Sequence, residues 1–314
     1  MFSVEIFVNY LQVDNMSEKE TPMVISILLP TRGRREMLKR SIDTLISKAA
    51  KPERLEILLG IDEDDDGVQE YLKEEVAPML VKHQVECRAN LFKPLGYENL
   101  HQYVNHLAST ASGEWLFFWN DDGLMVSDDW DLIIDRYRGQ FKLLAPTDNH
   151  NGHPYAIFPI LPRDWFILIE HLSMNAQNDA WLSHIAYMLD IFERIELEFF
   201  HDRADMTGNN DDETFRARKY MEGNPEDPRD FGHPQMQEAR VRTAHKIAWF
   251  LDKIGQKSEW WEAVKAGTQD PFEKMKQNTS ATVQGAGQFS ANDPTGQEKQ
   301  TRKTKIDSSA KLVL

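Results

Sequence analysis

The chain has 314 residues, a formal net charge of −15 and eight tryptophans, and 41% of its residues are hydrophobic. This composition is typical of a globular protein with one large core or two modest ones, and it excludes a wholly disordered chain. The acidic excess argues against nonspecific nucleic-acid binding, because neutralising phosphates requires clustered Lys and Arg. The single cysteine, Cys87, excludes an intrachain disulfide and a multi-thiolate metal site.

The start of the chain does not resemble a secretory signal. Its first twenty residues carry acidic side chains and lack a basic segment that leads into an apolar block. The apolar stretch over 23–29 is far shorter than the roughly 20 residues that span a bilayer. We therefore expect a cytoplasmic protein without a transmembrane segment. Met16 begins a segment that reads like an ordinary chain start, so residues 1–21 are expected to be an N-terminal extension.

Strands and helices alternate through the next two hundred residues. Continuous apolar runs predict buried strands over 24–29, 55–61 and 115–119, with a weaker strand over 85–88. Apolar residues at three- and four-residue spacing predict helices over 34–47, 68–80 and 97–111. Further strands are expected over 143–145 and 155–161, and a further helix over 179–192. This order predicts an α/β fold with a mostly parallel sheet flanked by helices.

The end of the chain has a different character. The segment 222–232 is rich in Pro, Gly and Asp and reads as a loop, and an amphipathic helix follows over 241–254. From residue 271 the chain is dominated by polar residues and should be disordered. We expect a catalytic domain over 22–225, a helical segment over 226–268 and a disordered tail over 269–314.

The ends of three predicted strands carry most of the polar side chains that could bind a ligand. Ligands of parallel sheets bind beyond the carboxyl ends of the strands. Carboxylates and arginines are therefore expected to gather at one edge of this sheet. The residues are Pro30, Thr31, Arg32 and Arg34 after the first strand, the acidic run 62–66 after the second, and Asn120, Asp121 and Asp122 after the strand over 115–119.

The acidic run over 62–66, followed by Gly67, opens like a calcium-binding loop. The twelfth position of such a loop should be a bidentate Glu, but here it is Lys73, and a strand rather than a helix precedes the run. Two alternatives remain, a solvated acidic turn and a ligand-binding role for Asp62, the first acid after the strand.

Asp121 and Asp122 follow a strand that must be buried. Adjacent carboxylates repel each other unless a cation or hydrogen-bond donors compensate. Oxygen ligands suit Mg²⁺ or Mn²⁺, and a site with few protein ligands keeps positions open for substrate phosphates. The alternative is an ordinary capped turn in which Gly123 supplies a positive φ.

The order of these segments resembles the glycosyltransferases of the GT-A fold, and among them family 2. Residues 25–38, with the Pro-Thr-x-x-Arg turn at 30–34, are similar to that family's opening strand and first helix. Residues 55–62 are similar to its second strand, and residues 113–122 to the strand that leads into its Asp-x-Asp motif. The resemblance covers about residues 23–200 and implies a GT-A, Rossmann-like sheet.

The resemblance implies that a nucleotide-sugar donor lies across the strand ends. Asp122 would then hold the divalent cation, Mn²⁺ or Mg²⁺, and Asp121 would face the ribose, because Asn120 replaces the first acid of the motif. The arginines are either phosphate ligands or solvated side chains of the first helical turn. The implied donor-binding residues are Pro30 and Thr31 in the turn, Arg32 and Arg34 at the phosphates, Asp62 at the base, and Asp121.

The resemblance also implies a catalytic base and a further metal ligand. Asp179 opens a predicted helix, as the family's catalytic Asp does, and would take the proton of the acceptor hydroxyl in an inverting transfer. Asn178 replaces the acidic neighbour found in the family. A helix N-cap is the alternative role for Asp179. His201 is either an additional metal ligand or a structural histidine.

The Gln-x-x-Arg-Trp motif of processive synthases is absent, which favours the transfer of one sugar. The acceptor hydroxyl could belong to a glycan, a lipid-linked sugar, a protein or a modified nucleobase, and the oligomeric state is open. Two rival functions remain. A sugar-phosphate nucleotidyltransferase would usually carry a Gly-rich loop where residues 30–34 contain one glycine. The other rival is a noncatalytic carbohydrate- or metal-binding module.

Overall fold

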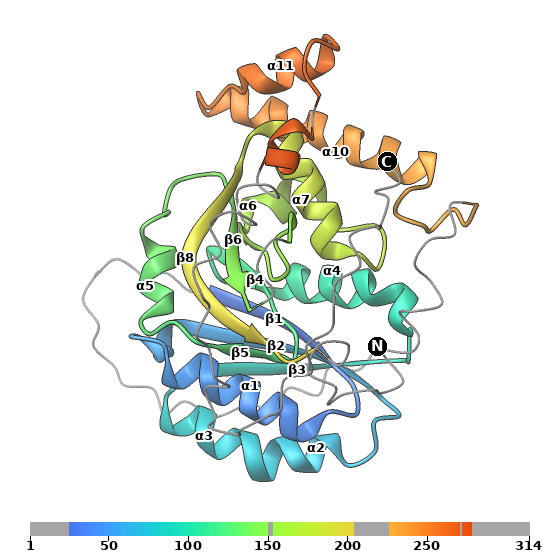
Figure 1. Ribbon diagram of the computed structural model, residues 1–314. Helices are drawn as coiled ribbons and strands as arrows, with labels where there is room; N and C mark the ends of the chain where they lie inside the picture. Colours follow the sequence, from blue (N-terminus) through green and yellow to red (C-terminus); the bar gives the residue numbers. More distant parts are fainter. Residues whose placement is uncertain (1–24, 150–152, 204–225, 271, 278–314) are drawn as a thin grey trace, which may run out of the picture.

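The computed structural model describes residues 25–149, 153–203, 226–270 and 272–277, and every structural statement below concerns these residues. They contain one eight-stranded sheet in the order β3-β2-β1-β4-β7-β6-β8-β5 (Figure 1). The strands are β1 Ile25–Thr31, β2 Leu55–Asp62, β3 Glu86–Phe92, β4 Trp115–Phe118, β5 Gly123–Met125, β6 Leu143–Asp148, β7 Ile160–Pro162 and β8 Phe192–His201.

Helices cover both faces of the sheet (Figure 1). One face carries α1 Arg35–Ser47, α2 Val68–Tyr71, a π-helical turn at Leu72–Val76, α3 Ala77–Lys82 and α5 Trp130–Asp135. The other carries α4 Leu100–Thr110, which follows the 3₁₀ turn Tyr97–Asn99, together with α6 Asp164–Ile169 and α7 Asn178–Leu189. At the end of the chain, α10 Pro234–Lys253 and α11 Glu259–Lys265 follow.

The parallel half of the sheet, β3-β2-β1-β4, forms as the apolar runs predict. All eight residues of β2 are buried, because both faces of the strand are covered. Alternate residues of β1 pack on opposite sides: Ile27 joins the core under α1, and Leu28 joins the core under α4. This parallel alignment brings the carboxyl ends of β1, β2 and β4 to a single edge. The expected α/β class, a mostly parallel sheet flanked by helices, is confirmed.

The second half of the sheet differs from the prediction. The helix α7 ends at Leu189, where Asp190 adopts a left-handed conformation with φ 59°, and the strand β8 begins at Phe192. The predicted helix over 179–192 therefore runs too far, and β8 was not predicted. The strand expected over 155–161 is confined to Ile160–Pro162. The short elements β5, α5, α6 and α11 were also not predicted.

The pairing of β5 with β8 matters for the polar edge. These two strands are antiparallel, and Gly123 lies opposite His201. The backbone N–H of Asp202 donates to the carbonyl of Asp122 at 2.8 Å. Gly123 does not have the positive φ that a capped turn would require. A Cβ at Gly123 would instead lie 2.6 Å from Phe158 and 2.8 Å from Trp119, so the glycine is needed for close packing.

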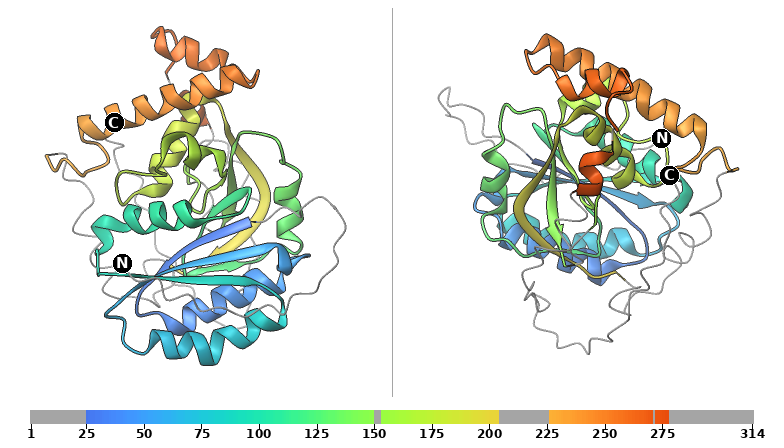
Figure 2. Two further views of the ribbon diagram at one scale, coloured as in Figure 1. Left: turned by 180° about the vertical axis from the view of Figure 1, so that it is seen from behind. Right: turned by 45° about the horizontal axis from the view of Figure 1, so that its top comes forward.

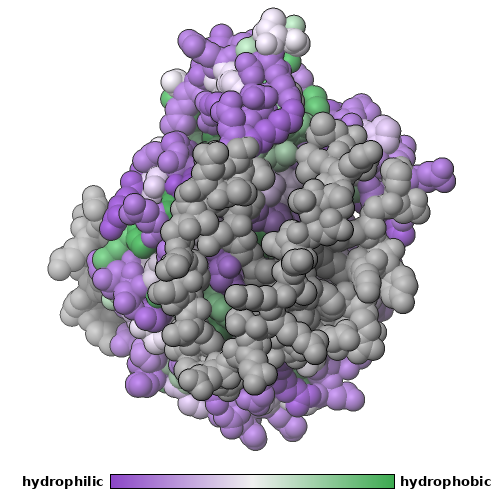
Figure 3. Space-filling model, in the orientation of Figure 1, coloured by the Kyte–Doolittle hydropathy of each residue, from purple (hydrophilic) through white to green (hydrophobic). Residues whose placement is uncertain are grey.

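The C-terminal helices α10 and α11 pack against α7, and α10 also packs against α6 (Figure 2). His184 of α7 is 8% exposed, and the rings of Tyr155, Phe231 and Phe272 lie 5.7, 4.7 and 4.3 Å from its own, centroid to centroid. The described surface in Figure 3 is mostly hydrophilic, which agrees with the net charge of −15.

No helix in the described residues combines the length and apolar character needed to cross a membrane. The expected extension over 1–21 and residues 278–314 of the expected tail lie outside the described residues. Residues 272–277 of that tail are described: 273–277 form a helical turn and Met275 is 3% exposed, so this part does not have the disorder expected from residue 271. The domain boundaries expected from the sequence stay predictions.

Candidate active site

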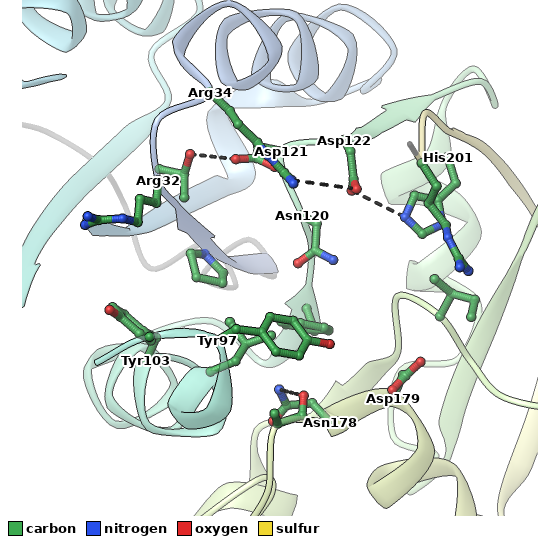
Figure 4. A pocket seen from close by; sticks show the side chains of 18 of the residues that line it. Arg32, Arg34, Tyr97, Tyr103, Asn120, Asp121, Asp122, Asn178, Asp179 and His201 are labelled. Atoms are coloured by element: carbon green, nitrogen blue, oxygen red, sulfur yellow. Dashed lines mark hydrogen bonds and ion pairs between the residues drawn. The ribbon is translucent and has the colours of Figure 1, made fainter. Parts of the chain in front are cut away.

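All nine side chains singled out in the sequence line one cavity at the carboxyl ends of β1, β2 and β4 (Figure 4). The cavity is completed by the first turn of α7 and by the end of β8. The three strand ends and the start of α7 therefore converge on one cavity, as expected from the sequence. The nine are Pro30, Thr31, Arg32, Arg34, Asp62, Asp121, Asp122, Asp179 and His201.

Asp121 is tied to the turn after β1. It is 4% exposed, and it accepts hydrogen bonds from Thr31 Oγ1 at 2.7 Å and Arg34 Nη1 at 3.0 Å. Burial raises the pKa of Asp121 to about 6, and the nearby charge of Asp122 adds to this against the opposing charge of Arg34. Arg34 Nη1 also lies 3.9 Å from Asp122 Oδ2. The sequence predicts that the adjacent carboxylates of Asp121 and Asp122 need a donor to offset their repulsion. Arg34 is that donor.

Asp122 faces His201 across the cavity edge. Its Oδ1 is buried without a hydrogen bond to any described residue, although Nε2 of His201 lies 3.3 Å away. Burial opposes the charged form of both groups, but their mutual attraction outweighs it: the pKa of Asp122 is lowered and that of His201 is raised. Nδ1 of His201 lies 3.8 Å from Asp148 Oδ2. The pair is an ion pair at the end of β8.

The Asp122–His201 pair fits a divalent cation as a partial ligand set. Two atoms that bind one Mg²⁺ in adjacent positions lie about 3 Å apart, since metal–ligand distances are about 2.1 Å, and the observed separation is 3.3 Å. Carboxylate and imidazole are both ligands of Mn²⁺ and related ions. Within the described ranges, no group of three or more His, Cys, Asp and Glu side chains forms a metal cage. Two protein ligands would leave positions for substrate oxygens.

Asp62 is 4% exposed and lines the same cavity, bound to Arg32 and Tyr103, which Figure 4 shows on the side away from His201. Its Oδ2 accepts a hydrogen bond from Arg32 Nη1 at 2.8 Å, and its Oδ1 accepts one from the hydroxyl of Tyr103. The Tyr103 hydroxyl in turn accepts from the backbone N–H of Leu95 at 2.9 Å. Asp62 is therefore held from both sides by donors.

The rest of the acidic run folds back onto the same turn. Arg32 also forms an ion pair with Asp64, and the backbone N–H of Gly33 donates to Asp65 Oδ2 at 2.8 Å. Asp64 and Asp65 are thus bound by Arg32 and a backbone amide, whereas Glu63 and Asp66 are exposed, so the run is a solvated turn only in part. It holds the Pro-Thr-x-x-Arg turn against the end of β2.

Asp179 is the second residue of α7, and Gln177 occupies the N-cap position. The alternative that Asp179 is a helix cap is therefore wrong. Asp179 is partly exposed at the cavity, whereas Asn178 beside it is 1% exposed. Figure 4 shows both on the wall opposite Asp122. Trp181, two residues further, is fully buried in the core rather than part of the cavity.

Several lining residues were not predicted. Tyr97, Tyr103 and Arg203 all border the cavity. Tyr103 recurs at helical spacing with apolar residues and therefore reads as a core side chain, although its hydroxyl binds Asp62. Tyr97 follows Gly96, whose φ of 73° marks a turn at the helix start. Tyr97 could have been recognised from the sequence by its place in the first turn of a helix whose start lies near the strand ends.

The family model for glycosyl transferase family 2 matches residues 26–196, more than half of the chain. The chain belongs to this family. It is therefore a glycosyltransferase, and membership decides against the two rivals, the nucleotidyltransferase and the noncatalytic module. No curated protein sequence matches the chain.

Two glycosyltransferases are among the solved structures to which this chain is similar. One is TarS of S. aureus, residues 1–349, in complex with UDP-GlcNAc, with 13% identity, a TM-score of 0.52, and coverage of 82% of this chain and 79% of that one. The other is the mannosyltransferase PcManGT of Pyrobaculum calidifontis in complex with GDP-Man and Mn²⁺, with 10% identity, a TM-score of 0.49, and coverage of 83% and 85%.

Proposed function

We propose that this glycosyltransferase moves one sugar from a nucleotide-sugar donor to an acceptor hydroxyl, with inversion, and that it requires a divalent cation, Mn²⁺ or Mg²⁺. One observation carries the proposal: the Asp122–His201 pair and Asp179 lie on opposite walls of the cavity at the strand ends (Figure 4). This arrangement separates a site for the leaving diphosphate from a site for the base.

Asp122 and His201 would hold the cation. When bound, a divalent cation acts as a Lewis acid that stabilises the charge developing on the leaving diphosphate, a contribution of several kcal/mol. Arg34 prepares this wall, because its ion pair with Asp121 removes much of the repulsion between neighbouring carboxylates. Pro30 and Thr31 shape the turn along which the donor lies.

Asp62 would bind the nucleobase. Its buried carboxylate is oriented by Arg32 and Tyr103, so it does not need to reorganise when a base arrives. In this proposal Arg32 orients Asp62 rather than binding phosphate directly, because it is engaged with Asp62 and Asp64. Asp121 likewise supports the donor wall through Thr31 and Arg34.

Asp179 would be the general base. It is the carboxylate on the wall opposite the Asp122–His201 pair, and its partial exposure lets an acceptor hydroxyl reach it from solvent. A base that takes the proton as the new bond forms typically contributes about 10²- to 10⁴-fold in rate. Attack from the wall opposite the leaving group gives inversion. The absence of a Gln-x-x-Arg-Trp motif supports a single transfer.

The test is donor turnover. The enzyme is incubated with UDP-, GDP- and dTDP-sugars in the presence of Mn²⁺ or Mg²⁺, and mass spectrometry follows release of the nucleoside diphosphate. We expect slow metal-dependent release from one of these donors. Asp179→Asn should bind that donor normally but lose transfer, and Asp122→Ala should lose metal-dependent donor binding. Release that is independent of metal, or an Asp179→Asn variant with full transfer, would overturn the corresponding part of the proposal.

A further inference from the structure

The two ring nitrogens of His201 face two different carboxylates. Nε2 lies 3.3 Å from Asp122 Oδ1, at the edge of the cavity, and Nδ1 lies 3.8 Å from Asp148 Oδ2. Asp148 is 6% exposed, and it is not among the residues that line the cavity. A ligand in the cavity therefore does not touch Asp148, which can act on that ligand only through His201 or through its charge.

The strand pairing places Asp148 beside His201. Asp148 ends β6 and lies opposite Phe199 in the parallel pairing of β6 with β8. Because Phe199 and His201 are two residues apart in a strand, all three side chains lie on the same face of the sheet. The register shifts by two residues just before Thr147. Without this shift Asp148 would lie opposite Leu197, two residues further from His201.

Other contacts hold the main chain and the ring of His201 in place. Asn149 Oδ1 accepts a hydrogen bond from the backbone N–H of His201 at 2.7 Å. The rings of Phe158 and Phe199 lie 5.0 and 6.2 Å from the imidazole, centroid to centroid. These rings carry no hydrogen-bonding atom. Among the described side chains, Asp148 is the carboxylate that faces Nδ1.

We propose that Asp148 is a positioning residue of the cation site: it accepts the Nδ1–H of His201 and so keeps the lone pair of Nε2 available to the cation beside Asp122. The inference rests on the proposed function and deepens it with a residue that touches neither donor nor cation. A histidine that ligates a metal through one nitrogen almost always donates the other N–H to a carboxylate, a carbonyl or water. This acceptor fixes the tautomer and raises the basicity of the ligating nitrogen.

The distance between the two groups suits this role. A hydrogen bond from Nδ1 requires a separation of about 3 Å, and the observed ion-pair distance is 3.8 Å. A small rotation of the Asp148 carboxylate about its side-chain bonds closes the difference. Burial makes the bond worth more, because an N–H donor enclosed by apolar rings is costly to leave without an acceptor.

A charge effect alone is the alternative, and the chain offers a matched control for it in Asp202. Asp202 follows His201, is 3% exposed and does not line the cavity. Its Oδ2 also lies 3.8 Å from a basic group, but this group is Nη1 of Arg40 rather than the imidazole. Asp202→Asn thus removes a buried negative charge next to the cation site and leaves the ring of His201 with its carboxylate.

The experiment measures Mn²⁺ affinity directly, from the electron paramagnetic resonance signal of the free ion, with UDP, GDP or dTDP present. Asp148→Ala should bind Mn²⁺ about 10- to 100-fold more weakly than wild type, the usual effect of losing such a partner. Asp148→Asn should lose less, because its amide oxygen still accepts the N–H, and Asp202→Asn should lose least. In a His201→Gln background neither change at Asp148 should weaken Mn²⁺ binding further, since residues that act through one group are not additive.

Three outcomes overturn the inference and leave the proposed function intact. Both Asp148 variants could bind Mn²⁺ as wild type does, or Asp202→Asn could match their loss, or the loss could persist in the His201→Gln background. Asp148→Asn keeps the size of the side chain, so it carries the test if Asp148→Ala does not fold. A wild-type enzyme that does not bind Mn²⁺, or a His201→Gln enzyme that binds it equally well, would instead overturn the proposed cation site and this inference with it.

Discussion

Replacement of Gly123 by alanine tests how tightly the cavity edge is built. Gly123 begins β5 directly after Asp122 and pairs with His201. An added Cβ would lie 2.6 Å from Phe158 Cε2, and 2.8 and 2.9 Å from two atoms of the Trp119 indole. Both rings are fully buried, and both pack against Phe199. Neither ring can yield without moving its neighbours.

The expected cost follows from this overpacking. Forcing a methyl group into a filled core typically destabilises a protein by about 1–3 kcal/mol, and 2 kcal/mol corresponds to a Tm lower by about 4–8 °C for a domain of this size. The shift also displaces Asp122, so kcat/KM should fall by roughly 10- to 100-fold, as small misplacements of catalytic groups do. Thermal unfolding and donor turnover measure the two effects.

Gly60→Ala is the matched control. Gly60 also lies in a buried strand, two residues before Asp62, but a Cβ there would meet Leu107, Phe92 and Tyr103 at 3.5 Å, which is ordinary van der Waals contact. The Tm of the Gly60→Ala variant should stay near that of wild type. The reasoning is refuted if Gly123→Ala unfolds at the wild-type temperature, or if the two variants lose equal stability.

Two further predictions concern titratable groups outside the cavity. Burial, with a smaller effect from Arg240, lowers the pKa of His184 to about 3. Because the unfolded chain binds the proton at a pKa near 6.5, stability falls as pH drops from about 6.5 toward 3, by about 2 kcal/mol at pH 5. Between pH 8 and pH 5, the free energy of unfolding of His184→Phe in urea should fall by about 2 kcal/mol less than that of wild type. Equal losses in the two proteins would contradict the lowered pKa of His184. Burial, followed by the charge of Glu86, raises the pKa of Cys87 to about 12, so native protein should react with Ellman's reagent at pH 8 about 100-fold more slowly than unfolded protein; equal rates would show an accessible thiolate.

The sequence sufficed to bring the polar residues of the strand ends to one edge because buried parallel strands leave a simple signature. Apolar runs such as 55–61 end where polar residues begin, and parallel alignment places those ends at one edge. Asp62 and Asp122 could therefore be located without knowledge of the helices. The partners of these residues could not, because the Thr31–Asp121 and Arg34–Asp121 bonds join residues about ninety positions apart.

The second half of the sheet shows a different limit. In β8, buried Ile195, Leu197 and Phe199 alternate with exposed Glu196 and Glu198, so a period-two signal is present in the sequence. The apolar character of α7 hid the boundary, since that helix is buried on nearly all sides and its end depends on a left-handed Asp190. β5 is three residues long, too short for any periodicity, and exists because Gly123 permits close packing.

The most direct test of the cation site is binding of the productive nucleoside diphosphate, from the UDP, GDP and dTDP series, to wild type and to Asp122→Asn. Asn keeps the size of the side chain but removes the charge that pairs with His201. We expect the wild-type affinity to rise on addition of Mn²⁺ and the variant's affinity to show no such rise. An Asp122→Asn enzyme whose affinity and Mn²⁺ dependence equal those of wild type would contradict the assignment of this wall to the cation and the diphosphate.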